Sequence, residues 1–532
     1  MVPENFDAIV VGAGFAGLYM LHRLRQNGLR TIAVEAGADV GGTWYWNRYP
    51  GARCDIESLQ YSYSFDERLQ QDWHWSERYA AQPEILKYIN HVADRFDLRR
   101  DIRFGRRVTD MDWSTDACLW HLRTDLGEKL NARFAVMATG CLSAARTPDM
   151  PGLEDFRGTA YYTGAWPHHE VKFTGQSVAV IGTGSTGIQV IPKIAHEARH
   201  LTVFQRTANF TLPARNGVLD AEHEKTWKRD YPAMRDKAGK SERALIQSAP
   251  QCSVFDVDAV ERERVFAEHW QRGGLDFVRS FTDLVADEKA NAVAADFVRA
   301  RIAEIVEKPE TAEVLKPRGI PLGARRICLD TDYYATYNRP NVTLVDLRAE
   351  PLVRFTATGI ETASRRHELD AVVFATGFDA MIGALSAIQI KGVRETLAEK
   401  WTRGITNYLG LAPAGFPNFF TVTGPGSPGI LCNVVVAIEQ HVEWISDCID
   451  YLCRNQFRAI ESNNDAEENW FNHANEVASK TMFMTAKNSW HISPELPGRP
   501  RTLMPYAGGF ADYTKICCDV AAANYCGFKL IR

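Results

Sequence analysis

The chain has 532 residues, of which 45% are hydrophobic and 24% charged, and its formal net charge is -5 at pH 7. This composition is typical of a globular protein with large cores, and the length predicts two to four domains of ~100–200 residues each. The charge gives no reason to expect nucleic acid or an anionic membrane as a partner. No apolar run approaches the ~18 residues that a membrane span needs, and the first residues, MVPENFD, lack the basic start of a secretory signal.

The 11 cysteines show neither CxxC pairs nor zinc-ligand spacing. Unpaired thiols in a reducing compartment explain this distribution best. We therefore expect a cytoplasmic protein without a metal site. The expected oligomeric state is a monomer or a weak homo-oligomer, and the cysteines do not bear on it.

The first pattern with a functional meaning is a βαβ unit near the N-terminus. An apolar strand at 8–11 leads into a GxGxxG motif, a segment with helical spacing of apolar residues follows, and the next strand ends at Glu35. The glycines of the motif are Gly12, Gly14 and Gly17. They allow a tight turn, close backbone approach to a pyrophosphate and close helix–strand packing, and the diphosphate then lies at a helix N-terminus.

The stretch VGGTWYWNRYPGARCDIES, which follows, suits a second part of the same cofactor. Gly42 permits close backbone contact, while Trp44 and Trp46 suit a position beside a flat ring as well as a place in the core. An ATG tripeptide follows an apolar strand at 138–140 and again at 375–377. Small residues at a strand end indicate backbone that is pressed close to a cofactor.

A second βαβ unit repeats the first at an offset of 170 residues, after the aromatic and glycine-rich segment FRGTAYYTGAWP. A strand at 177–181 precedes another GxGxxG motif, and the following strand ends at Gln205. The glycines of this second motif are Gly182, Gly184 and Gly187. A single motif of this kind arises often by chance, but two inside βαβ units strongly favour two dinucleotide-binding domains.

The register of the two units assigns their ligands. Glu35 can accept hydrogen bonds from ribose hydroxyls, as the adenosine of FAD or NAD requires. The matching residue is Gln205, which Arg206 and Thr207 follow. A carboxylate at this position would repel a 2′-phosphate, whereas Gln-Arg-Thr offers donors and a fixed positive charge. The first unit therefore predicts FAD or NAD, and the second predicts NADP.

Farther along the chain, the spacing of apolar residues predicts a helical insertion. Helical spacing is shown by Ala294, Phe297, Val298, Ile302 and Ile305, in a region rich in Glu, Arg, Ala and Lys. A basic cluster, LKPRGIPLGARR, follows and ends at Arg326. By itself this cluster is typical of a solvated loop.

Taken together, these motifs resemble those of the type I Baeyer–Villiger monooxygenases, over nearly the whole chain and most closely those of the phenylacetone monooxygenase branch. The family fingerprint FxGxxxHxxxWP lies between two GxGxxG motifs, and GGTWYWNRYPGARCDIES, GARRICLDTDYYATYNRPNV, ATGFDAMIGAL and GFPNFFTVTGPGSPG add to the match. The fingerprint positions are Phe156, Gly158, Tyr162, Trp166 and Pro167. Tyr162 departs from the family histidine: it can donate a hydrogen bond but carries no positive charge near pH 7. In the family this segment is the hinge between the domains, so the departure concerns coupling rather than reaction type.

The resemblance implies an α/β fold with two Rossmann-like dinucleotide-binding domains, one for FAD and one for NADP, and a helical insertion. The implied boundaries are 1–145 and 378–532 for the FAD domain, 146–213 and 321–377 for the NADP domain, and 214–320 for the insertion.

The resemblance also implies the reaction. NADPH would reduce FAD, reduced flavin and O2 would give a C4a-peroxyflavin, and one oxygen atom would be inserted next to the carbonyl of a small-molecule ketone to give an ester or lactone. Arg326 would be the catalytic arginine, which stabilises the peroxide and the oxyanion of the adduct, with Asp55 to orient it. Arg325 would lie near the 2′-phosphate of NADPH.

Further site residues follow from the same resemblance. The cofactor-binding set is Gly12, Gly14, Gly17, Glu35, Gly42, Thr43, Trp44, Asp55, Gly182, Thr183, Gly184, Ser185, Thr186, Gly187, Gln189, Arg206, Thr207, Arg325 and Trp490. The substrate-lining loop is Gly429, Ile430, Leu431 and Cys432. His441 is interpreted as a core or interface histidine rather than a base, and Cys54 as a neutral pocket lining.

Three alternatives stay open at this point. A flavin monooxygenase that oxidises amines or sulfides is the nearest, although Trp166-Pro167 favours the Baeyer–Villiger type. A flavin disulfide reductase needs paired cysteines beside the flavin, and only Cys54 lies in the right stretch. A non-catalytic NADP-binding sensor has no need of Asp55 and Arg326. The ketone itself, whether linear, aryl, cyclic or steroidal, is not determined by the sequence.

Overall fold

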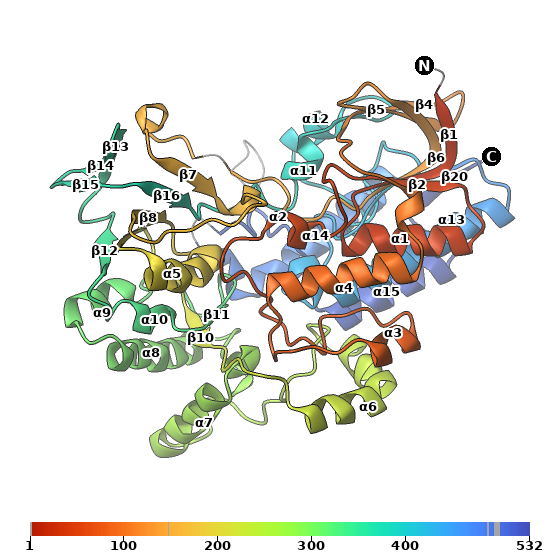
Figure 1. The fold of residues 1–532 in the computed structure, drawn as a ribbon. Coiled ribbons are helices and arrows are strands. Elements are labelled where there is room, and N and C mark those ends of the chain that lie inside the picture. Colours follow the sequence, from red (N-terminus) through yellow and green to blue (C-terminus); the bar gives the residue numbers. More distant parts are fainter. Residues whose placement is uncertain (1–2, 147, 487–488, 494–500) are drawn as a thin grey trace.

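The computed structural model describes residues 3–146, 148–486, 489–493 and 501–532. Two sheets, each covered by helices, lie side by side (Figure 1). We call each sheet with its helices the first and the second domain. Within the described residues, every helix is too short or too polar to cross a membrane.

The sheet of the first domain combines strands from both ends of the chain. Its order is β17-β4-β5-β6-β1-β2-β3, and β18 pairs with β6. β1 pairs in parallel with both β2 and β6. The strands are β1 (Glu4–Val11), β2 (Thr31–Val34), β3 (Ile102–Arg103), β4 (Val108–Ser114), β5 (Leu119–Thr124), β6 (Lys129–Met137), β17 (Gln389–Lys391) and β18 (Phe419–Thr421).

Helices from both chain ends cover this sheet. Apolar side chains of α1, α4 and α13 meet in one core, among them Leu21, Ile89 and Ile445. A two-stranded antiparallel sheet of β19 (Ala459–Ser462) and β20 (Phe528–Ile531) lies beside them. The helices are α1 (Phe15–Gln26), α2 (Thr43–Trp46), α3 (Glu67–Asp72), α4 (Gln82–Arg95), α11 (Gly383–Ser386), α12 (Leu397–Thr402), α13 (Val434–Arg454), α14 (Asn464–Ser479) and α15 (Phe510–Ala522).

The second domain has a fully parallel sheet with the order β12-β9-β8-β16-β7. Its strands are β7 (Thr159–Tyr162), β8 (Ser177–Ile181), β9 (His200–Gln205), β12 (Val342–Asp346) and β16 (Ala371–Phe374). The smaller elements around it are α5 (Ser185–Glu197), α9 (Pro309–Leu315), α10 (Tyr333–Thr336), the pair β10 (Thr211–Pro213) and β11 (Cys328–Asp330), and the antiparallel strands β13 (Leu352–Thr356), β14 (Gly359–Thr362) and β15 (Arg366–Glu368). The predicted α/β fold with two Rossmann-like domains is confirmed.

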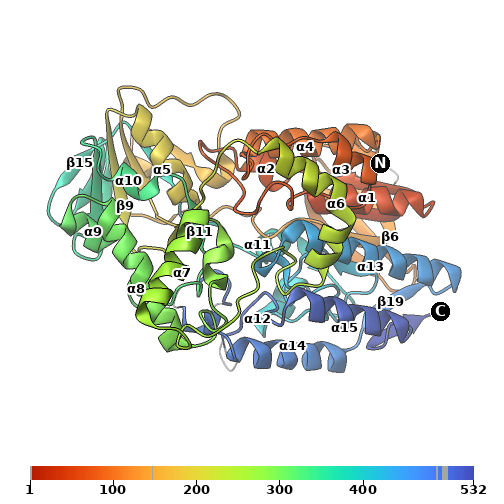
Figure 2. The same cartoon turned by 90° about the horizontal axis from the view of Figure 1, so that it is seen from below.

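The helical insertion packs on both domains, as Figure 2 shows. It contains α6 (Ala221–Gly239), α7 (Ala259–Arg272) and α8 (Glu288–Ile305), and the predicted 294–305 helix lies within α8. Trp227 and Tyr231 of α6 join the core of the first domain, whereas Phe266 of α7 and Phe297 of α8 join that of the second. The chain therefore crosses between the domains inside the insertion.

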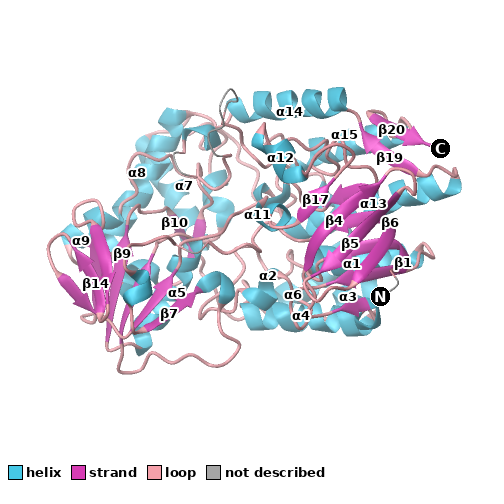
Figure 3. Cartoon of the chain, turned by 90° about the horizontal axis from the view of Figure 1, so that it is seen from above, coloured by secondary structure: helices cyan, strands magenta, loops and turns pink. Residues whose placement is uncertain are grey.

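Two further segments cross between the domains and run antiparallel, between the sheets seen in Figure 3. They are residues 138–146 and 375–381. Ala145 pairs with Phe378, and the Asp379 N–H donates to the Ala144 carbonyl over 2.9 Å. Both segments begin at the ATG tripeptides predicted to contact cofactors.

Candidate active site

The first glycine turn is shaped by direct backbone contacts. Gly12 has a φ of +109°, and a Cβ on it would lie 2.5 Å from the Ala138 carbonyl oxygen. A Cβ on Gly17 would lie 1.9 Å from the Gly12 oxygen. Gly14 faces Gly42, whose Cα lies 3.2 Å from the position of an added Cβ. No side chain caps α1 at Gly14, so its first N–H groups are available to an anion.

Glu35 lies at the end of β2 and lines the same cavity. Its carboxylate accepts hydrogen bonds from the Ala13 N–H over 2.7 Å and the Gly37 N–H over 2.6 Å. Burial raises the pKa of Glu35, although these backbone hydrogen bonds oppose the shift. The carboxylate is thus fixed in place, with lone pairs left for ribose hydroxyls.

The second glycine turn repeats this geometry. Gly182 has a φ of +108°, and an added Cβ would lie 2.5 Å from the Ala375 oxygen, while one on Gly187 would lie 2.2 Å from the Gly182 oxygen. Around Gly184 nothing lies within 4 Å of such a Cβ, and α5 starts there without a side-chain cap. Each ATG tripeptide therefore supports one glycine turn, and each turn leaves room and free N–H groups for a pyrophosphate.

Gln205 does not supply a donor to the second ligand, contrary to the reading of Gln-Arg-Thr as one donor set. It is 2% exposed, and its Nε2 donates to the Val314 carbonyl of α9 over 2.8 Å. Arg206, Thr207 and Arg325 line the cavity as expected. The side chain of Gln205 turns away because α9 covers the end of β9.

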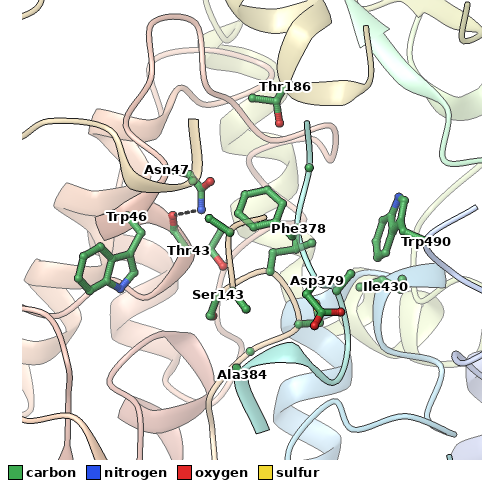
Figure 4. A pocket seen from close by; sticks show the side chains of 18 of the residues that line it. Thr43, Trp46, Asn47, Ser143, Thr186, Phe378, Asp379, Ala384, Ile430 and Trp490 are labelled. Carbon is green, nitrogen blue, oxygen red and sulfur yellow. Dashed lines mark hydrogen bonds between the residues drawn. The ribbon is translucent and has the colours of Figure 1, made fainter. Parts of the chain in front are cut away.

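One cavity of about 1610 Å³ joins both glycine turns. Figure 4 shows Thr43 and Trp46 on one side of it, with Trp490 and Ile430 on the other. Most predicted binding residues line it, including Gly42, Thr43, Trp44, Asp55, Thr183, Ser185, Thr186, Gln189, Arg206, Thr207, Arg325 and Trp490. Of the substrate loop, Ile430 and Cys432 line the cavity, whereas Leu431 packs in a separate apolar cluster and Gly429 is not part of the wall.

Gln189 also joins the domains. Its Oε1 accepts from the Tyr49 hydroxyl over 2.7 Å, and its Nε2 donates to the Arg53 carbonyl over 3.1 Å. Both partners belong to the first domain, so the start of α5 is held against the segment after α2.

Arg326 and Asp55 meet in the cavity wall. Arg326 Nε lies 3.5 Å from Asp55 Oδ2, and the two side chains are 34% and 5% exposed. Asp55 Oδ1 accepts the Leu329 N–H over 3.4 Å, and Arg326 Nη1 donates to the Ile430 carbonyl over 3.5 Å. Burial alone would lower the pKa of Arg326, but the Asp55 carboxylate outweighs it and the pKa is raised. The guanidinium is therefore a permanent cation, oriented toward the cavity.

The groups around this pair are neutral near pH 7. Burial raises the pKa of Cys54 and of Cys328 to about 12 and that of Cys141 to about 11, and all three thiols line the cavity. All eleven cysteines are free, so no redox disulfide lies beside the glycine turns. Sequence reasoning missed Cys141 and Cys328 because their stretches carry no cysteine pair.

His441 is a core residue, as interpreted from the sequence. It is fully buried on α13, and its Nδ1 accepts the Thr423 N–H over 3.0 Å. Burial lowers its pKa to about 3. It therefore stays neutral and carries a hydrogen bond rather than a mobile proton.

The fingerprint segment lies on the edge of the second domain. Tyr162 ends β7 and stacks on Phe374 of β16, with ring centroids 5.1 Å apart. Phe374 directly precedes the second ATG tripeptide. Trp166 is 5% exposed and stacks on Tyr161 at 5.3 Å.

The same segment contacts both crossing segments. A Cβ on Gly164 would lie 2.7 Å from the Phe378 ring and 2.8 Å from Ala145 Cβ. The nearby Gly158 has no room for a side chain either, since a Cβ would lie 2.6 Å from the Asp370 oxygen. Pro167 lines a second cavity of about 830 Å³, against α4. The fingerprint segment therefore contacts both of the crossing segments that connect the two domains.

The residues present fit two dinucleotides. Each glycine turn leaves an uncapped helix N-terminus at the cavity, and Glu35, Arg206 and Arg325 line the same cavity. A carboxylate suits ribose hydroxyls, and guanidinium groups suit a phosphate. Arg326 lines the cavity that joins the two turns, and it donates a hydrogen bond to the carbonyl of Ile430 in the substrate loop.

Comparison with known proteins agrees with this geometry. The family model described as pyridine nucleotide-disulphide oxidoreductase matches residues 6–229. A Baeyer–Villiger monooxygenase of Pseudooceanicola batsensis is 40% identical over 98% of this chain and 96% of its own length. A phenazine N-monooxygenase of Lysobacter antibioticus is 42% identical over 99% of this chain and 97% of its own.

Among solved structures, an oxidized steroid monooxygenase bound to NADP is 47% identical, with a TM-score of 0.94 and 99% of each chain covered. The similarity extends over both domains and the insertion, and it includes the expected family. The chain therefore belongs to the Baeyer–Villiger monooxygenase family.

Proposed function

We propose that this chain is an FAD-containing monooxygenase, which uses NADPH and O2 to insert one oxygen atom next to a ketone carbonyl and releases an ester or lactone. The observation that carries the proposal is the Arg326–Asp55 pair, at 3.5 Å, in the wall of a cavity shared by two dinucleotide turns. A disulfide reductase would need paired thiols there, and a binding sensor would not need a half-buried, oriented cation.

The chemistry divides between cofactor and protein. When bound and reduced by NADPH, FAD supplies an oxygen atom derived from O2. Arg326 holds its positive charge beside the substrate and stabilises the negative charge that develops on the substrate oxygen. Asp55 orients the guanidinium and lies deeper in the wall.

The wall near Arg326 holds few groups that could exchange protons at neutral pH. Cys54 and Cys141 are protonated thiols, because burial raises the pKa of each. This composition suits a reaction that stabilises an anion and excludes water, and it does not suit general-base catalysis.

We propose that residues 1–145 and 378–532 form the FAD domain, residues 146–213 and 321–377 the NADP domain, and residues 214–320 the insertion. We also propose that the fingerprint segment is a hinge between the two domains. Tyr162 contacts Phe374, and Gly164 contacts Ala145 and Phe378, which supports a link between the segment and the domain crossings.

The experiment is ester formation by Arg326→Ala and Arg326→Lys, assayed with a panel of linear, aryl, cyclic and steroidal ketones. Loss of one stabilising donor costs ~10²–10³ in kcat, so we expect Arg326→Ala to lose at least this much while FAD stays bound. Arg318→Ala, in the same basic segment but exposed and paired with Glu313, should behave like the parent. Ester formation at the parental rate by Arg326→Ala would assign the role to another group.

N-oxidation is a second candidate function, favoured by the 42% identity to a phenazine N-monooxygenase. When bound and reduced by NADPH, the same FAD would supply an oxygen atom derived from O2 to a nucleophilic ring nitrogen. This reaction forms no substrate oxyanion and so does not need a cation to stabilise one. Tested with phenazines beside the ketones, Arg326→Ala should distinguish the two: an N-oxide still formed by the variant, without ester from the parent, would favour the second function.

We further propose that the enzyme acts in the cytoplasm as a monomer or weak homo-oligomer. The eleven free cysteines support a reducing compartment. Light scattering during gel filtration, at several protein concentrations, tests the oligomeric state.

A further inference from the structure

Two arginines meet at the corner of the second domain where β9 and β12 end. These strands are parallel neighbours, with Asp346 opposite Gln205. Arg206 follows β9 directly, and Arg348 follows β12 by two residues. The carboxyl ends of neighbouring parallel strands lie at one sheet edge, which is where such sheets bind ligands.

Hydrogen bonds fix the turn after β12 against the turn after β9. The Leu347 N–H donates to the Gln205 carbonyl over 2.8 Å, and Arg348 Nε donates to the Arg206 carbonyl over 2.8 Å. Asp346 Oδ1 accepts the Arg348 N–H over 3.0 Å. Leu347 lines the cavity together with Arg206. Arg348 is the next residue after Leu347, and its Nε bond to the Arg206 carbonyl keeps its guanidinium beside this part of the wall.

The corner brings three arginines together beside the Asp346 carboxylate. In the part of the chain that the structure describes, neither Arg206 nor Arg348 forms an ion pair with a carboxylate. Burial lowers the pKa of Arg325, and the charges of Arg206 and Arg348 lower it further, so all three guanidinium groups share one electrostatic environment. Such a group of cations favours a ligand with more than one negative charge.

We propose that Arg348 binds the 2′-phosphate of the coenzyme together with Arg206 and Arg325, and so helps to select NADP over NAD. This inference rests on the proposed use of NADPH. In this proposal Arg348 makes two kinds of contact. Its Nε holds the backbone carbonyl of Arg206, and its terminal nitrogens donate to the phosphate. It takes the place of the donor that Gln205 does not provide, since Gln205 is bound to Val314.

The test is calorimetric titration of the purified FAD-bound enzyme with 2′,5′-ADP and with 5′-ADP. A charge-assisted hydrogen bond to phosphate corresponds to ~10-fold or more in affinity, so Arg348→Ala should weaken 2′,5′-ADP by at least this factor and leave 5′-ADP unchanged. The affinity of Arg348→Lys for 2′,5′-ADP should lie between that of the parent and that of Arg348→Ala, because a lysine keeps the charge but not the fork of donors. Arg199→Ala is the control, since Arg199 is exposed at the opposite end of the same strands and pairs with Asp370.

Two results would overturn the proposal. Equal weakening of both probes by Arg348→Ala would mean that the residue only supports the turn, and unchanged binding of both would mean that it has no role. A double-mutant cycle with Arg206→Ala should show coupling, because Arg348 also holds Arg206. Ester formation by the parent is measured separately: a parent that selects 2′,5′-ADP through Arg348 but forms no ester would refute the proposed function and leave this inference intact.

Discussion

Buried carboxylates at this site are held by backbone N–H groups before any ligand arrives. Glu35 accepts from Ala13 and Gly37, and Asp55 accepts from Leu329. Because the backbone fixes these oxygens, the proposed ribose acceptor Glu35 and the partner of Arg326 are preorganised. Preorganised charge acts without reorganisation at the moment of reaction, which is the main source of electrostatic stabilisation in enzymes.

The buried histidine His441 should make the stability of the protein depend on pH. Burial lowers its pKa from 6.5 to about 3, so the native state stays neutral where the unfolded chain takes up a proton. Its stabilising contribution is complete above pH 6.5 and is lost as the pH falls from 6.5 toward 3. At about pH 5 the loss is ~2 kcal/mol.

Acidification from neutral pH should therefore lower the Tm of the parent more than that of His441→Gln, whose amide oxygen can still accept the Thr423 N–H. His223→Gln, at an exposed position of α6, is the control and should follow the parent. The same pH dependence of Tm in all three proteins would contradict this account of His441.

In the second glycine turn, Gly187 and Gly184 are glycine for different reasons. Gly187 allows α5 to pack closely on β8, whereas Gly184 leaves room for a ligand. Gly187→Ala would place a Cβ 2.2 Å from the Gly182 oxygen and force α5 away from β8, so we expect a lower Tm and lost NADP+ binding. At Gly184 nothing lies within 4 Å, so Gly184→Ala should fold normally and weaken only NADP+ binding. Thermal unfolding and NADP+ titration measure both effects, and Gly217→Ala, in open space, is the control. A Gly184→Ala variant that binds NADP+ normally would place the pyrophosphate elsewhere.

The fingerprint strand β7 predicts an effect on coupling, the ratio of ester formed to NADPH consumed. Tyr162→His should keep the stack on Phe374 and the same product, with any change confined to this ratio. Trp166→Ala should be worse, because removal of a buried aromatic costs ~3–5 kcal/mol and breaks the stack on Tyr161. We expect a larger fraction of NADPH to end as hydrogen peroxide in this variant. Parental coupling in both variants would exclude a hinge role.

Across the whole molecule, the predictable features were those set by local spacing. The glycines of both turns and the residue Glu35 follow from short motifs, so their places in the structure agree with the sequence. The direction of Gln205 does not follow from such a motif, because its partner Val314 lies in α9, 109 residues farther along the chain. Arg348 was missed for the same reason: it reaches Arg206 only through the pairing of β12 with β9.

The insertion shows the same limit at the level of domains. Helical spacing predicts α8, which packs on the second domain, but no local pattern shows that α6 packs on the first domain. That contact includes hydrogen bonds from Lys228 to the Gln71 and Trp73 carbonyls and from Arg235 to the Gln60 carbonyl. Such long-range contacts are decided by tertiary packing.

The central claim is that both domains act together to place one oxygen atom of O2 into a ketone. The most direct measurement is a single reaction of the parent with a ketone substrate, NADPH and ¹⁸O2, analysed by mass spectrometry together with NADPH consumption. We predict an ester or lactone that carries one ¹⁸O atom, formed in proportion to the NADPH consumed. NADPH consumption that yields hydrogen peroxide but no labelled ester, with every ketone class in the panel, would contradict the account.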